Sequence, residues 1–238
     1  MSDGGAADVE DDFMGYRVLV IALFCYGLLF GPALLASEYR QPGRSHGVLV
    51  LGDSISAAYG IDKRDGWVAL LAQRLEPQCP HVNIHNASVS GETSAGGLAR
   101  LPGLLAAHQP RLLVIELGGN DGLRGLSPRQ MSKNLQQMVT LAEGAGAQVA
   151  LLGMLMPPNL GAAYVRLFEQ AMGEVGADES VYFQAFFLQN VAGNRDLIQS
   201  DGLHPTAAAQ PRLLDNAWQL LEEPLAEICQ SRTGIRKL

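Results

Sequence analysis

The sequence predicts an α/β fold in which a five-stranded parallel sheet lies between two layers of helices. From residue 47 onward, short apolar runs alternate with amphipathic stretches. This alternation is typical of βαβ units, whose crossover helices cover both faces of a parallel sheet. Ser127-Pro128 and His204-Pro205 each place a proline where the first turn of a helix tolerates it. We therefore expect a flavodoxin-like three-layer α/β/α sandwich.

The elements follow in order along the chain. The apolar runs predict strands over 47–52, 82–87, 111–118, 147–155 and 180–184. The amphipathic stretches predict helices over 67–76, 94–108, 127–145 and 162–175, and a last helix that begins near Pro205. No repeat or low-complexity segment interrupts this series. One folded domain over 47–224, followed by a C-terminal tail over 225–238, has the usual size for a single core.

An uncharged apolar run, residues 18–36, precedes the predicted domain. It predicts a secretory signal peptide or an uncleaved membrane anchor within an N-terminal extension over 1–36, joined to the domain by a linker over 37–46. A buried core helix is the alternative. Five acids before Met14 are unfavourable where a positive flank is expected, so Met14 is a candidate start. We expect a periplasmic or secreted protein, held at the membrane if the segment is not cleaved.

The charge of the chain excludes one class of binding partner. A formal net charge of -7 and the lack of a lysine/arginine cluster argue against nucleic-acid binding.

The sequence contains three cysteines. Cys25 lies in the apolar run without the small preceding residues of a lipoprotein signal. Cys79 and Cys229 are compatible with a disulfide or with two free thiols. In a flavodoxin-like order both follow helices on one face, so both should lie at the sheet edge opposite Ser54.

Reactive or hydrogen-bonding residues follow several of the predicted strands, where open α/β sheets bind their ligands. Ser54 follows the first strand, at the turn into a helix whose N–H groups would converge on an anion. A serine there can attack a carbonyl while its own N–H holds the oxyanion. An ordinary helix N-cap is the alternative role.

The segment "SDGLHP" places Asp201 three residues before His204. In one tight turn the carboxylate can orient the imidazole, whose other nitrogen can face the serine. An exposed turn without function has the same spacing. Asn120 in "LGGND" and Gly91 in "SVSGETS" follow two further strands, and with Ser54 they would complete a three-donor oxyanion hole. A simple turn at Asn120 and a positive φ at Gly91 are the structural alternatives.

These four ordered blocks resemble those of the SGNH, or GDSL, hydrolase family. The stretches "ARLPGLLAAHQPRLLVIELGGNDGLRG" and "MPPNLGAAY" are similar to its thioesterase I / lysophospholipase L1 / arylesterase branch. The resemblance implies an SGNH hydrolase fold with Ser54 as nucleophile, His204 as base and Asp201 as its orienting acid. It also implies oxyanion donors at Ser54, Gly91 and Asn120. No "GxSxG" elbow competes with this interpretation.

The expected activity is a serine ester or thioester hydrolase that acts through an acyl-enzyme on Ser54. Its substrates would be small-molecule esters, thioesters or lysophospholipids, and we expect a monomer without a cofactor. A carbohydrate O-acetylesterase and a non-catalytic acyl-chain-binding protein are the rival functions. The segment 155–164 should form a lip over the acyl chain, with substrate contacts from Pro158, Asn159 and Leu160.

No metal site is expected, because the histidines outside the "SDGLHP" block lack partners at ligand spacing. These histidines are His46, His81, His85 and His108.

Overall fold

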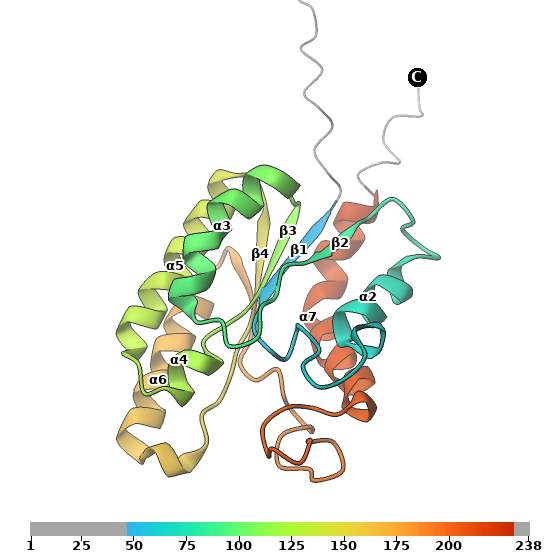
Figure 1. Ribbon diagram of the computed structural model, residues 1–238. Coiled ribbons are helices and arrows are strands. Elements are labelled where there is room, and N and C mark those ends of the chain that lie inside the picture. Colours follow the sequence, from blue (N-terminus) through green and yellow to red (C-terminus); the bar gives the residue numbers. More distant parts are fainter. Residues whose placement is uncertain (1–46, 231–238) are drawn as a thin grey trace, which may run out of the picture. The chain divides into compact units, whose positions relative to one another are not determined.

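The computed structural model describes residues 47–230, which form a five-stranded sheet with helices on both faces (Figure 1). All neighbouring strands are parallel, and their order is β2-β1-β3-β4-β5. The strands are β1 Val48–Gly52, β2 Ile84–Asn86, β3 Leu112–Glu116, β4 Gln148–Leu152 and β5 Val181–Gln184. This is the predicted flavodoxin-like order, and it brings the carboxyl ends of β1 and β3 together.

The helices divide between the two faces of the sheet. In Figure 1, α2 and α7 lie on one side of the sheet, and α3, α5 and α6 lie on the other. The helices are α2 Trp67–Leu75, α3 Ser94–His108, α4 Gly119–Leu123, α5 Pro128–Gly144, α6 Ala162–Gly176 and α7 Gln210–Gln230. Short 3-10 turns cover η1 Lys63–Asp65, η2 Pro158–Leu160 and η3 Ala207–Ala209. Ser127 caps α5 and Pro128 begins it, as predicted.

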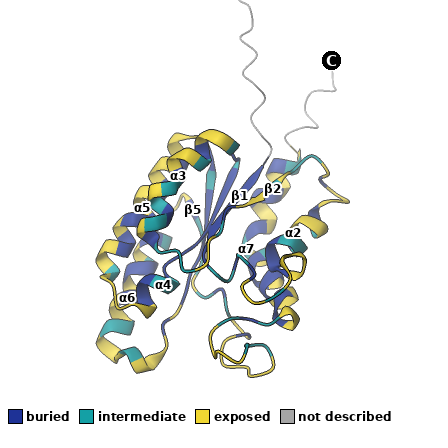
Figure 2. Cartoon of the chain, in the orientation of Figure 1, coloured by how far each residue is buried: buried dark blue, intermediate teal, exposed yellow. Residues whose placement is uncertain are grey.

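The core lies between the sheet and these two helix layers. Every residue of β1 and β3 is buried, because helices cover both faces of the central strands. The edge strand β2 is short and has no fully buried residue. Figure 2 shows this contrast, with buried strands at the centre and exposed residues on the outer faces of the helices. The site at the strand ends is therefore built on a rigid support.

The last helix begins later than predicted. Pro205 is not its first residue: it forms an isolated antiparallel bridge with Ile198, and Thr206 precedes the 3-10 turn that leads into α7. The bridge keeps Pro205 extended, which its fixed φ permits. Residues 198–205 therefore form a closed loop instead of a helix start. α7 also continues to Gln230, past the expected domain end at residue 224, because buried Leu225 and Ile228 extend its apolar face.

The chain after β1 also differs from the expectation that a helix begins at Ser54. Residues 54–60 form consecutive turns, and α2 begins only at Trp67. The Ala57 N–H makes the one i→i−4 hydrogen bond of this turn, to the Asp53 carbonyl at 3.0 Å. Ala58 then adopts a φ of 58°, which ends any helical path. Ser54 thus lies on a tight turn rather than at a helix N-terminus.

Cys79 and Cys229 form a disulfide, with their Cα atoms 5.6 Å apart. The bridge joins the segment after α2 to the end of α7. Near that end, Glu227 accepts a hydrogen bond from Gln148, the first residue of β4. The bridge therefore lies toward the amino ends of the strands, at the edge opposite Ser54, as expected.

The predicted signal or anchor segment lies outside the described residues. Within residues 47–230, none of the helices combines the length and apolar character of a membrane span.

Candidate active site

Ser54, His204 and Asp201 form one hydrogen-bonded chain at the carboxyl edge of the sheet. The Nε2 atom of His204 lies 2.9 Å from Ser54 Oγ, and its Nδ1 atom lies 2.7 Å from Asp201 Oδ2. The hydrogen bond to His204 is the largest of several interactions that lower the Asp201 pKa to about 2. Asp201 is therefore ionised at neutral pH and can accept a hydrogen bond from the Nδ1–H group of His204. This arrangement leaves Nε2 free to take a proton from the serine.

The Asp201–His204 turn is held against the turn after β1. Asp201 Oδ1 accepts the backbone N–H groups of Leu203 and His204, which fixes the spacing of the motif. Gln199 donates its side-chain amide to the carbonyls of Tyr59 and Pro205, so it clamps the two turns together. The Tyr59 ring also lies 4.5 Å from the His204 ring, centroid to centroid. These contacts maintain the distance between base and nucleophile.

Gly91 lies in a turn after β2 and has a φ of +79°, which favours glycine. The Arg124 guanidinium, just after α4, donates to the Gly91 carbonyl at 2.8 Å. No group among residues 47–230 accepts the backbone N–H of Ser54 or of Gly91. Both donors are therefore available to a ligand.

Asn120 lies in the short helix α4, which directly follows β3. Its Nδ2 atom donates to Asp53 Oδ2 at 3.0 Å, which leaves a second N–H on the same nitrogen. The next residue, Asp121, is buried and accepts both the N–H and the hydroxyl of Ser94. Asn134 of α5 donates to the same hydroxyl, so α4 is tied to α3 and α5. This network fixes the position of the Asn120 backbone.

Two carboxyl groups are buried directly behind Ser54. Asp53 is 3% exposed and Glu116 is fully buried. Burial raises the Asp53 pKa to about 6. Burial and the neighbouring Asp53 raise the Glu116 pKa well above its usual value. Asp53 lies beside the nucleophile but does not touch His204 Nδ1, so it is no substitute for Asp201.

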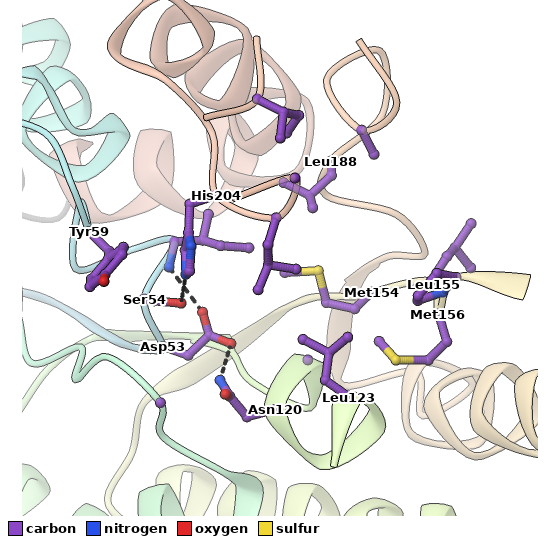
Figure 3. A pocket seen from close by; sticks show the side chains of 18 of the residues that line it. Asp53, Ser54, Tyr59, Asn120, Leu123, Met154, Leu155, Met156, Leu188 and His204 are labelled. Carbon is purple, nitrogen blue, oxygen red and sulfur yellow. Dashed lines mark hydrogen bonds between the residues drawn. The ribbon is translucent and has the colours of Figure 1, made fainter. Parts of the chain in front are cut away.

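A cavity of about 550 Å³ opens beside Ser54. Figure 3 shows Ser54 and His204 close together, with the leucine and methionine side chains beyond them. The cavity is lined by the predicted residues Ser54, Gly91, Asn120 and His204, and its apolar wall includes Leu123, Met154, Leu155, Met156 and Leu188. Its size falls within the range of small-molecule sites.

The predicted substrate contacts at Pro158, Asn159 and Leu160 are not part of this lining. The same segment contributes Leu155, Met156 and Pro157 instead. The chain turns away after Pro157 into η2, and Leu160 packs against the hydrophobic core. The predicted lip 155–164 therefore borders the cavity through its first three residues, and the contacts predicted at 158–160 are wrong.

Four residues that shape the site were not predicted from the sequence. They are Asp53, Tyr59, Glu116 and Gln199. The sequence did indicate that Glu116 is unusual, because it is the one charged residue in the otherwise apolar strand "LLVIE". Burying an unpaired carboxyl group is unfavourable, so an acid at this position suggests a specific role. No sequence pattern indicated Tyr59 or Gln199, because their contacts depend on how two distant loops meet.

His81, His85 and His108 lie within the described residues, whereas His46 lies outside them. Among residues 47–230, no group of three or more histidine, cysteine, aspartate or glutamate side chains could hold a metal ion. His85 and His108 stack with ring centroids 3.7 Å apart, away from the cavity lining.

Comparison with known families and proteins gives a consistent result. The model of the GDSL-like lipase/acylhydrolase family matches residues 50–211. Esterase TesA of Pseudomonas aeruginosa is 50% identical over 195 residues, which cover 82% of this chain and 97% of that protein. An arylesterase of Vibrio mimicus is 39% identical and covers 76% of this chain and 90% of its own length. Thioesterase 1/protease 1/lysophospholipase L1 of Escherichia coli K12 is 39% identical, covering 71% of this chain and 79% of its own.

Solved structures agree with this result. A crystal structure of TesA superposes with a TM-score of 0.72 at 52% identity, covering 75% of this chain and 99% of that one. The psychrotrophic esterase EstA from Pseudoalteromonas, inhibited by monoethylphosphonate, also has a TM-score of 0.72, at 39% identity, and covers 76% and 99% of the two chains.

Proposed function

Because this chain belongs to the GDSL-like lipase/acylhydrolase family and is a serine ester/thioester hydrolase, we propose that Ser54 is its nucleophile, His204 its general base and Asp201 the acid that orients the base. The observation that carries this proposal is the continuous hydrogen-bonded chain from Ser54 Oγ through the His204 ring to Asp201 Oδ2. A non-catalytic acyl-chain-binding protein is set aside, because the named relatives are hydrolases.

The reaction follows from this geometry in two halves. His204 Nε2 takes the Ser54 proton while Oγ attacks the carbonyl carbon of the ester or thioester. His204 then gives that proton to the leaving alcohol or thiol, and an acyl-serine remains. In the second half, His204 Nε2 takes a proton from the water that attacks the acyl-serine. It then returns that proton to Ser54 Oγ as the bond to the acyl carbon breaks and the carboxylic acid leaves. Asp201 stays ionised throughout and stabilises the imidazolium.

The negative charge of each tetrahedral intermediate needs donors that are already in place. We assign this role to the N–H groups of Ser54 and Gly91 and to the second N–H of Asn120. Losing one such donor typically lowers kcat by about 10² to 10³.

We propose that the substrates carry an apolar acyl or aryl group, as in aryl esters, acyl thioesters and lysophospholipids. The apolar wall of the cavity supports this class. Four of the exposed large hydrophobic residues also border the cavity: Tyr59, Leu123, Leu155 and Leu203. A carbohydrate O-acetylesterase fits less well, because a sugar needs many polar partners and this rim offers few.

We further propose that the protein acts in the periplasm or after secretion. Its disulfide supports this, since such bonds persist mainly in oxidising compartments. The apolar run at 18–36 has the composition of an export signal.

A fluorophosphonate probe tests the proposed nucleophile. Wild-type protein should bind one equivalent and lose its esterase activity, because the probe phosphonylates the activated serine. Ser54→Ala should neither bind the probe nor hydrolyse esters, while Ser90→Ala, beside the same cavity, should do both. Labelling that persists in Ser54→Ala would place the nucleophile elsewhere.

A further inference from the structure

The acid pair Asp53–Glu116 lies behind the nucleophile, and the mechanism above does not use it. Neither side chain is part of the Ser54–His204–Asp201 chain. Burying two carboxyl groups side by side is unfavourable, because at most one of them can ionise without strong repulsion. Because this buried pair costs stability and lies under the catalytic turn, we expect it to have a functional role.

Both oxygens of Asp53 accept hydrogen bonds from the site itself. Oδ1 accepts the Ile55 N–H at 3.0 Å, and Oδ2 accepts the Asn120 amide at 3.0 Å. Figure 3 shows Asp53 between Ser54 and Asn120, with the Asn120 contact drawn as a dashed line. Asp53 therefore links the nucleophile turn to the oxyanion donor on α4.

Glu116 supports the same turn from below. Its Oε2 atom accepts the Ser56 hydroxyl at 2.7 Å and the N–H groups of Ser56 and Asp53, both at 3.3 Å. A side chain at Gly52 would collide with that oxygen, so the glycine leaves room for it. The other oxygen, Oε1, is buried and has no hydrogen-bond partner among residues 47–230. Because Glu116 is more enclosed than Asp53, we expect Glu116 to be the protonated member of the pair.

The orientation of Asn120 depends on which acid carries that proton. A primary amide can turn by half a rotation and exchange its NH₂ group for its oxygen. An ionised Asp53 has only acceptors, so it binds the NH₂ group and the second N–H stays available for the oxyanion. A protonated Asp53 can instead donate to the amide oxygen, and the reversed amide no longer offers its N–H to the substrate in the same way.

We propose that Asp53, ionised above a protonated Glu116, is the positioning residue that holds the Asn120 amide in its donor orientation. This inference rests on the proposed function, in which Asn120 is an oxyanion donor. In this proposal Asp53 determines whether the NH₂ group or the oxygen of the Asn120 side chain faces the reacting carbonyl.

Acid pH should reverse this arrangement. Burial raises the Asp53 pKa to about 6, whereas Asn120, Ile55, His204 and Glu116 act in the opposite direction. His204 and Glu116 are the titratable groups that face Asp53 among residues 47–230. Protonation of Asp53 should therefore reduce activity on the acid side, and it should make the acid limb of kcat/KM steeper than in a protein that lacks this step.

A double-mutant cycle with Asp53→Asn and Asn120→Ala tests the proposal. An asparagine at 53 mimics the protonated acid, so kcat should fall by about 10² or more with little change in KM. In the Asn120→Ala background the same substitution should have no further effect on kcat, because its target is gone. Asp178→Asn is the matched control: Asp178 also accepts an N–H two residues on, but in the turn before β5. It should keep wild-type kinetics.

The pH profile gives an independent readout that does not need the Asp53 variant to fold. Asn120→Ala should have a single-group acid limb, whereas the wild type should have the steeper one. Equal slopes in the two proteins, or additive losses in the cycle, would overturn the positioning role. Neither outcome would affect the assignment of Ser54, which depends on probe labelling.

Discussion

The carboxylate of Asp201 holds His204 at two places at once. Oδ2 lies 2.7 Å from the ring Nδ1, and Oδ1 accepts the His204 backbone N–H at 3.0 Å. One side chain therefore fixes both the ring and the turn that carries it. The consequence is that neutralising Asp201 should disturb the tautomer of the base.

Asp201→Asn should lower kcat by about 10⁴, because an amide can donate to Nδ1 and favour the unproductive tautomer. The fold should persist, since Asp201 lies in a loop outside the core. Steady-state kinetics with p-nitrophenyl esters would measure the loss, and Asp196→Asn in the same loop serves as the control. A loss below tenfold would mean that Asp201 does not orient the base.

Leu155→Ala should shift the preference for acyl-chain length, while Leu160→Ala should mainly lower stability. Leu155 lines the cavity and is 43% exposed, so its removal enlarges the site with little cost to the fold. Leu160 packs on the core, and its truncation should cost about 2 kcal/mol. A panel of p-nitrophenyl esters and urea unfolding would separate the two effects. The opposite pattern would restore Leu160 as a substrate contact.

Replacing both Cys79 and Cys229 by serine should destabilise the protein without slowing catalysis. The bridge closes a loop across 150 residues, for which the chain-entropy model gives about 5 kcal/mol. It lies at the edge opposite Ser54, so kcat at 25 °C should stay within about twofold of wild type. Thermal unfolding with and without reductant would measure the loss, and the serine variant should not respond to reductant. Two alkylated thiols in unreduced protein would contradict the bridge.

The stability of Asp53→Asn relative to wild type should change with pH in a defined direction. The folded-state Asp53 pKa is raised from 3.8 to about 6, so the folded state binds the proton more tightly. Wild type should therefore lose stability as the pH rises from about 4 to 6, by about 3 kcal/mol, while the variant should not. Above that range the difference should be constant. Urea unfolding at pH 4.5 and 7.5 would test this, and a variant that gains nothing at pH 7.5 would contradict the raised pKa.

The fold was predictable because its signals are local and repeated. Strands such as 48–52 and 112–116 are apolar throughout, and Ser127-Pro128 marks the start of α5 in three dimensions as it does in the sequence. The strand order β2-β1-β3-β4-β5 is that of a flavodoxin-like sheet, in which the crossovers are right-handed. The positions of Ser54, Gly91, Asn120 and His204 then follow from the strand ends.

Other features were not predictable, because they depend on contacts between distant segments. The turn at 54–60 does not continue as a helix, because Ala58 adopts a φ of 58°, and Glu116, sixty residues later, accepts the Ser56 N–H and hydroxyl. Pro205 leaves the helix because Ile198 pairs with it. Leu160 turns to the core for a similar reason, although its neighbours in the sequence border the cavity. In each case a contact with a residue far away in the sequence overrides the local conformational preference, and the local sequence does not indicate that contact.

The direction of α7 has a practical use. The helix begins beside the catalytic loop and ends near the amino ends of the strands, where Glu227 binds Gln148 and Cys229 is cross-linked. A solid support attached near Gln230 would therefore hold the molecule at the end that the Cys79–Cys229 disulfide cross-links. The mouth of the cavity would face the bulk liquid, so an immobilised preparation should process bulky esters as readily as the free enzyme.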